Sequence, residues 1–162
     1  MPKYRHQLPQ LSGGLFLTDG GLETRLIFHD GIDLPYFASF DLLRTKLGPA
    51  HIRVYYERYI AIAKRNGAGF VLEGATWRAN PDWAEKLGYS RAELAVANRA
   101  AVDLMVGLRD AHESERTPIV ISANIGPRGD GYRIKNAMTF TEAEDYHGWQ
   151  VSIFRDTEAD LV

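Results

Sequence analysis

The sequence predicts an α/β protein in which parallel strands alternate with helices. Apolar runs with the length and composition of buried strands lie at residues 15–19, 69–73, 118–123 and 159–162. Stretches with three- and four-residue apolar spacing, which is typical of amphipathic helices, separate these runs. Because strands that are apolar on both faces need cover on both sides, this order favours a parallel sheet built from βα units.

Composition restricts the class of protein. The chain has 162 residues and a formal net charge of −2, so we expect one globular domain over residues 1–162. Lys and Arg are scattered, which argues against nucleic-acid and membrane partners. The polar N-terminus lacks the apolar core of a signal peptide, and we expect a cytoplasmic protein. The absence of cysteine excludes disulfides, thiolate metal ligands and a cysteine nucleophile within the chain.

The first strand and the first helix are separated by a mixed stretch. Residues 15–19 lie between glycine pairs, which predicts a short strand that ends at Asp19. The stretch at 22–47 predicts a long loop with a broken helical turn. A helix then begins near Gly48 and Pro49, since proline suits the first helical turn. Its apolar stripe comprises Ile52, Tyr55, Tyr56, Tyr59, Ile60 and Ala63.

Capping boxes predict the start of two further helices. Ser90 pairs with Glu93 in the first, and Thr141 pairs with Glu144 in the second. The apolar stripe of the first is Leu94, Ala97, Ala101, Leu104, Met105 and Leu108. That of the second is Tyr146, Trp149, Gln150, Ile153 and Phe154.

Polar residues and glycine follow each of the first three strands. Asp19 precedes Gly20 and Gly21, Glu73 opens the segment 73–76, and the third strand leads into the segment 124–131. Because parallel strands place ligands at their carboxyl ends, these segments together predict one binding rim. Each segment alone is typical of a turn. The tryptophans at 77, 83 and 149 are more typical of a core than of a binding surface.

Three blocks of sequence resemble the homocysteine S-methyltransferase family. They are Asp19-Gly20-Gly21-Leu22-Glu23-Thr24, then Gly67-Ala68-Gly69-Phe70-Val71-Leu72 leading to Thr76, then Asn124-Ile125-Gly126-Pro127-Arg128-Gly129. Their order and separation are similar to the N-terminal half of that family, and the resemblance covers nearly the whole chain. It implies a (β/α)8 TIM barrel of which this chain is the first half, truncated near strand four.

The resemblance also implies an activity. Family members transfer a methyl group from a small sulfonium, betaine or folate-type donor to the thiol of homocysteine, which gives methionine. They use zinc, held by three cysteine thiolates on strands six and eight, to keep the homocysteine sulfur as a thiolate. This chain contains neither those cysteines nor, by this resemblance, a catalytic residue. We therefore expect a complementing C-terminal half or a homo-oligomer, and an isolated chain without methyltransferase activity.

Individual site residues follow from the same resemblance. The substrate-binding positions that it implies are Asp19, Gly20, Gly21, Thr76, Asn124 and Gly126, with Glu23 and Glu73 as additional candidates. Asp19 matches the acid that contacts the homocysteine amino group, and a carboxylate is a sensible partner for an ammonium. Glu73 and Gly74 replace what is commonly a Thr-Asn-type pair, which indicates a divergent branch.

Two other functions are compatible with these residues. Asp19 and Glu73 follow neighbouring strands, which lie about 5 Å apart in a sheet, and such a carboxylate pair could serve a hydrolase on a barrel. The third interpretation is a non-catalytic fragment or binding subunit that recruits a partner through the edge of its half-barrel.

Overall fold

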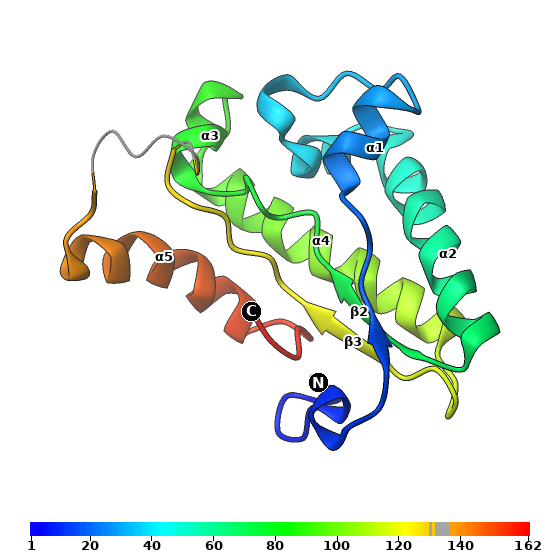
Figure 1. Cartoon of the computed structure of the whole chain (residues 1–162). Coiled ribbons are helices and arrows are strands. Elements are labelled where there is room, and N and C mark those ends of the chain that lie inside the picture. Colours follow the sequence, from blue (N-terminus) through cyan, green and yellow to red (C-terminus); the bar gives the residue numbers. More distant parts are fainter. Residues whose placement is uncertain (130, 132–136) are drawn as a thin grey trace.

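The computed structural model describes residues 1–129, 131 and 137–162. Within these residues a parallel sheet has the order β1-β2-β3, formed by β1 (Phe16–Leu17), β2 (Gly69–Glu73) and β3 (Ile119–Ser122). Phe16 is in register with Gly69, and Phe70 is in register with Ile119. The parallel sheet and its alternation with helices are therefore confirmed (Figure 1).

The fourth predicted strand forms only a single bridge to the sheet. Leu161 makes an isolated parallel bridge to Ser122. The Ala123 N–H donates to the Leu161 carbonyl oxygen at 2.9 Å, and the Asp160 N–H donates to the Ile121 carbonyl oxygen at 2.8 Å. The chain thus joins β3 on the side opposite β2, in the parallel orientation that the sequence predicts.

The long helices are those with an apolar stripe. They are α2 (Gly48–Asn66), α4 (Arg91–His112) and α5 (Phe140–Arg155). Helix α4 contacts both α2 and α5, and it packs against β3 while α2 packs against β2 (Figure 1). Their buried faces meet β2 and β3 in a core that includes Ile52, Phe70, Leu72, Met105, Leu108 and Ile121. No helix in the described ranges is both long and apolar enough to cross a membrane.

Shorter helices fill stretches of the sequence that have no periodic apolar pattern. The predicted loop at 22–47 is wrong in part, because it contains α1 (Leu22–Phe28) and the 3-10 helices η2 (Pro35–Phe37) and η3 (Ser39–Arg44). Helix α1 buries only Leu22 and Leu26, too few positions for a recognisable stripe. Helix α3 (Pro81–Lys86) and the 3-10 helix η1 (Pro9–Ser12) are similarly short.

The capping box of α5 lies two residues earlier than predicted. Thr139, not Thr141, is the N-cap, and its hydroxyl accepts from the Glu142 N–H at 3.3 Å. The Glu142 carboxylate in return accepts from the Thr139 N–H at 2.8 Å. Both threonines precede a glutamate by three residues, so the sequence pattern alone does not distinguish them. The other predicted box, Ser90 with Glu93, is confirmed.

The N-terminal segment binds the segment that follows α5. The Arg5 guanidinium donates to the carbonyl oxygens of Arg155, Thr157 and Ala159, at 2.9, 3.0 and 2.6 Å. The Tyr4 N–H donates to the buried Asp160 carboxylate at 2.7 Å. These bonds lie near the amino ends of the strands. The loops that follow β1, β2 and β3 lie at the opposite end of the sheet (Figure 1).

Candidate functional site

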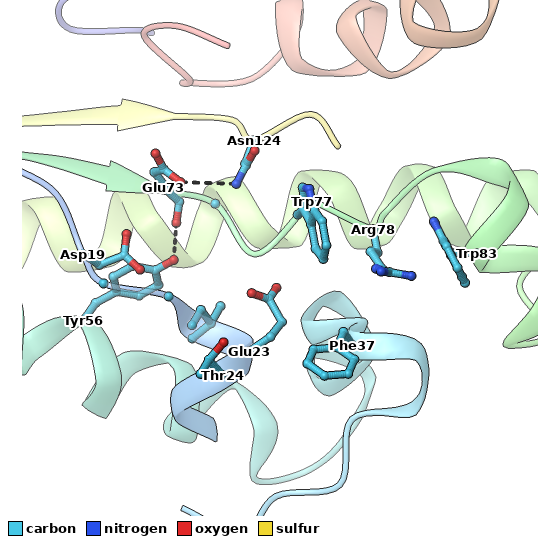
Figure 2. Close-up of a pocket in the computed structure, with 14 residues that line it drawn as sticks. Asp19, Glu23, Thr24, Phe37, Tyr56, Glu73, Trp77, Arg78, Trp83 and Asn124 are labelled. Carbon is cyan, nitrogen blue, oxygen red and sulfur yellow. Dashed lines mark hydrogen bonds between the residues drawn. The ribbon is translucent and has the colours of Figure 1, made fainter. Parts of the chain in front are cut away.

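A cavity of about 690 Å³ lies where the loops after the three strands meet. Most of its lining comes from the segment after β1 and from the segment that begins at the end of β2. The lining residues are Asp19, Gly20, Gly21, Leu22, Glu23, Thr24, Phe37, Tyr56, Glu73, Gly74, Trp77, Arg78, Trp83 and Asn124. Figure 2 shows Asp19, Glu23 and Glu73 around the same space, with Asn124 beside Glu73. Residues that follow each of the three strands therefore line one cavity.

Asp19 is held in place from helix α2. The Tyr55 hydroxyl donates to Asp19 Oδ2 at 2.5 Å and accepts from the Gly21 N–H at 2.9 Å. Gly21 has a φ of 134°, a conformation that is strained for any residue with a Cβ. The sequence Asp19-Gly20-Gly21 thus turns the chain from β1 into α1 while its backbone faces the cavity.

Glu73 stands at the end of β2, next to the loop after β3. Asn124 Nδ2 donates to Glu73 Oε2 at 3.2 Å, and the hydroxyl of Tyr56 donates to the Glu73 carbonyl oxygen (Figure 2). Burial, and then the negative charges of Asp19 and Glu23, raise the pKa of the Glu73 carboxyl. The side chain and the backbone of this residue are thus both fixed at the cavity.

Glu23 lines the cavity from the first turn of α1. Its Oε1 accepts from the buried Ser39 hydroxyl at 2.6 Å. Burial raises the pKa of the Glu23 carboxyl, and the hydrogen bond from Ser39 offsets part of that increase. Burial is therefore the largest influence on the pKa of the Glu23 carboxyl.

Thr76 and Gly126 shape the loops rather than line the cavity. The buried Thr76 hydroxyl donates to the Asn124 carbonyl oxygen at 2.7 Å and accepts from the Asn124 N–H at 3.1 Å. A Cβ on Gly126 would lie 2.0 Å from the Trp77 carbonyl oxygen, so only glycine fits there. Both residues join the loop after β2 to the loop after β3. Of the predicted segment 124–131, Asp130 lies outside the described residues.

A buried polar network fixes the loop after β2 from behind. Gln150 Nε2 donates to the Thr76 carbonyl oxygen at 3.3 Å and to Asn98 Oδ1 at 2.9 Å. Asn98 Nδ2 donates to the Ala79 carbonyl oxygen at 3.0 Å. Helices α4 and α5 therefore hold this loop through hydrogen bonds as well as apolar contacts, which favours a preformed cavity wall.

Aromatic side chains also line the cavity. The Arg78 guanidinium stacks 3.9 Å from the centroid of the Trp83 ring and 4.6 Å from that of Trp77. Phe37 adds a further ring, and its φ of 56° is unusual for a residue with a side chain (Figure 2). Trp77 and Trp83 thus line the cavity, contrary to the prediction that they belong to the core.

Sequence reasoning missed the tyrosines and Phe37 as site residues. Tyr55 and Tyr56 fall on the apolar stripe of α2, so their spacing indicates only burial. Phe37 lies in a stretch that was predicted as a loop. One signal was present in the sequence. A buried tyrosine hydroxyl needs a hydrogen-bond partner, and two adjacent tyrosines on an apolar stripe indicate polar groups nearby, such as those at the ends of the strands.

The described residues do not fit a zinc site. The sequence has no cysteine. Over the described ranges, moreover, no three or more His, Asp or Glu side chains are grouped so that they could hold a metal ion. The carboxylates of the cavity are instead bonded to Tyr55, Ser39 and Asn124. We therefore assign no chemical step to a metal bound by these residues.

The chain has a parallel α/β sheet with a cavity at the carboxyl ends of its strands. This arrangement is typical of α/β proteins built from βα units, which bind ligands at that edge of the sheet. Within that class, the family model described as homocysteine S-methyltransferase matches residues 16–162. The chain belongs to this family. Comparison with curated protein sequences gave no significant match.

Two solved structures share the fold. They are the homocysteine methyltransferase MmuM from Escherichia coli in its metallated form, with a TM-score of 0.73 and 21% identity, and in its oxidized form, with a TM-score of 0.74 and 20% identity. The alignments cover 96% and 98% of this chain. The chain spans only 55% and 56% of those two chains, so it matches part of their fold.

Proposed function

We propose that this chain supplies the homocysteine-binding part of a homocysteine S-methyltransferase. In the reaction, the homocysteine thiolate attacks the methyl carbon of a small donor, the donor's bond to that methyl group breaks, and methionine forms. The observation that carries the proposal is the cavity in which Asp19, Gly20 and Gly21 lie together in a chain of this family.

The cavity offers complementary groups for an amino acid. In the proposed complex, Asp19 accepts hydrogen bonds from the homocysteine ammonium, while the backbone at Gly20 and Gly21 lets the ligand approach closely. Tyr55 occupies one acceptor position of the Asp19 carboxylate, and a carboxylate has several. Glu23 and Glu73 add negative charge that favours a cationic group, and Asn124 orients Glu73. Thr76 and Gly126 support the site by joining its loops.

The remaining parts of the enzyme are proposed to come from outside this chain. We propose that the rest of a TIM barrel, as a complementing C-terminal half or in a homo-oligomer, supplies the cysteine thiolates. When bound there, zinc would stabilise the thiolate form of homocysteine. The cytoplasmic location that the sequence predicts stays a prediction.

Binding of homocysteine to the chain tests the proposal directly. Titration calorimetry under reducing conditions should detect binding to the wild type, and Asp19→Asn should weaken it by roughly 10- to 100-fold, because a charged hydrogen-bond acceptor is lost. Asp33→Asn, which changes an exposed aspartate outside the cavity lining, is the matched control. Equal affinity of the Asp19 variant and the wild type would contradict the proposed role of Asp19.

A hydrolase remains the second candidate because of one observation. Asp19 and Glu73 line the same cavity, and the pKa of Glu73 is raised, which suits a general acid. Membership of the methyltransferase family favours methyl transfer over this alternative. Release of nitrophenol from a panel of nitrophenyl glycosides and esters, abolished by Glu73→Gln, would favour the hydrolase.

A further inference from the structure

Tyr55 connects helix α2 to both ends of the turn that carries Asp19. Its side chain is 1% exposed, and its hydroxyl donates to Asp19 Oδ2 at 2.5 Å. The same hydroxyl accepts from the Gly21 N–H at 2.9 Å. One oxygen therefore sets the distance between the Asp19 carboxylate and the backbone of Gly21, and both residues line the cavity. Tyr55 itself is not part of the cavity lining.

Neighbouring rings fix the position of this hydroxyl. The Tyr55 ring lies 5.0 Å from that of Tyr56, nearly perpendicular to it at 81°, and 5.0 Å from that of Tyr59. Tyr56 reaches the next strand, where its hydroxyl donates to the Glu73 carbonyl oxygen. Two consecutive residues of α2 thus anchor the ends of β1 and β2. A side chain packed in this way loses little further freedom when a ligand binds.

We infer that Tyr55 is a positioning residue, which orients the Asp19 carboxylate and the glycine turn that follows it for an amino-acid ligand. The identity of the ligand rests on the proposed function, whereas the orientation of the turn does not. Burial, and then the hydrogen bond to Asp19, raise the pKa of the Tyr55 phenol. The packing requires only the ring, which phenylalanine would also supply, so the hydroxyl is the part of the side chain that acts on the site.

The variant Tyr55→Phe separates positioning from packing. We expect it to weaken homocysteine binding by about tenfold, the effect of one lost hydrogen bond to a charged group. Binding of 4-mercaptobutanoate, which is homocysteine without its amino group, should change less than about twofold, because that ligand does not use Asp19. Tyr89→Phe is the matched control: it removes a tyrosine bond to Asp41, at 2.9 Å, outside the cavity lining, and should alter neither affinity.

A ligand-free measurement keeps the inference independent of the proposed function. Amide hydrogen exchange at Gly21, followed by NMR, should accelerate by about tenfold in Tyr55→Phe, because the N–H loses its acceptor, and should not change in Tyr89→Phe. Accelerated exchange in a chain whose wild type binds no homocysteine would support the positioning of the turn and overturn the proposed function.

Two results would overturn the role of Tyr55. The first is unchanged exchange at Gly21 in Tyr55→Phe. The second is an equal loss of affinity for homocysteine and for 4-mercaptobutanoate, which would indicate a merely structural effect. The double variant Asp19→Asn with Tyr55→Phe adds a further check, since a residue that acts through Asp19 should have no additional effect on homocysteine binding once Asp19 is replaced.

Discussion

At the scale of single residues, each carboxylate of the cavity has a neutral hydrogen-bond donor beside it. Tyr55 donates to Asp19, Ser39 to Glu23 and Asn124 to Glu73. Such donors orient a carboxylate without cancelling its charge. Arg78 supplies positive charge to the lining and lowers the pKa of Glu23, but burial is the larger influence on that residue and raises it. The site thus carries a stability cost that a cationic ligand would reduce.

Glu23 provides a test of this cost. Because its pKa is raised above the ordinary 4.5 in the folded chain, the folded state binds the proton more tightly than the unfolded state. The resulting stability is complete below about pH 4 and is lost as the pH rises through the raised value. Glu23→Gln does not titrate and can still accept from Ser39, so it should be more stable than the wild type at pH 7, with a gap that closes below pH 4.

The measurement is urea unfolding of both proteins at pH 4 and pH 7. Glu144→Gln, which replaces an exposed glutamate of α5, serves as the control and should show no such pH-dependent gap. A wild type that is more stable than Glu23→Gln at pH 7 would show that its contacts outweigh the cost of burial.

At the scale of elements, local signals predicted the strands and the long helices because those signals are strong and repeated. The apolar runs at 69–73 and 118–123 have few alternatives to a buried strand, and α4 has a capping box followed by a long stripe. Helix α1 has no such signal. Its two buried leucines, Leu22 and Leu26, stabilise the helix by packing into the main core, and tertiary packing of this kind leaves no local pattern in the sequence.

The sequence predicts those site residues whose position depends only on the parallel direction of the strands. Asp19 and Glu73 lie together because parallel strands end at the same edge. Phe37, Trp83 and Tyr55 reach the site from other elements, so tertiary packing places them. Thr76 is polar and lies in the predicted rim, but its hydroxyl bonds the backbone of Asn124, and Thr76 does not line the cavity.

The start of α5 gives a prediction at this scale. Thr139→Ala removes the side chain that caps the helix and should lower the free energy of unfolding by about 1 kcal/mol. Thr141→Ala, two residues along and exposed, is the matched control and should change it by less than about 0.5 kcal/mol. Thermal or urea unfolding of both variants measures this. The reverse order would place the N-cap at Thr141.

At the scale of the whole molecule, a cavity lies at the carboxyl ends of the strands, and the described residues form no metal-binding group. Its family match covers residues 16–162, and its structural matches cover little more than half of the MmuM chains. The cavity is lined by side chains from both sides of the turn after β1 and from the loop after β2. The proposed binding of homocysteine and the proposed methyl transfer can therefore be tested separately.

We expect the 162-residue chain alone to produce no methionine from homocysteine and S-methylmethionine, because it has no cysteine to hold zinc. The assay is chromatographic detection of methionine, alongside metal analysis of the same sample. MmuM from Escherichia coli is the positive control. Methionine formation together with stoichiometric zinc would contradict the expectation and would require ligands other than thiolates.

The bonds of Arg5 have a consequence for how the chain is assembled. They join positions about 150 residues apart, so closing them costs more loop entropy than any contact within one βα unit. Contacts of such high sequence separation slow folding. During synthesis, Arg5 emerges well before the carbonyls of residues 155–159 and must wait for them. The turn at Asp19 and the tyrosines of α2 can meet before then, so this part of the cavity does not depend on the bonds of Arg5.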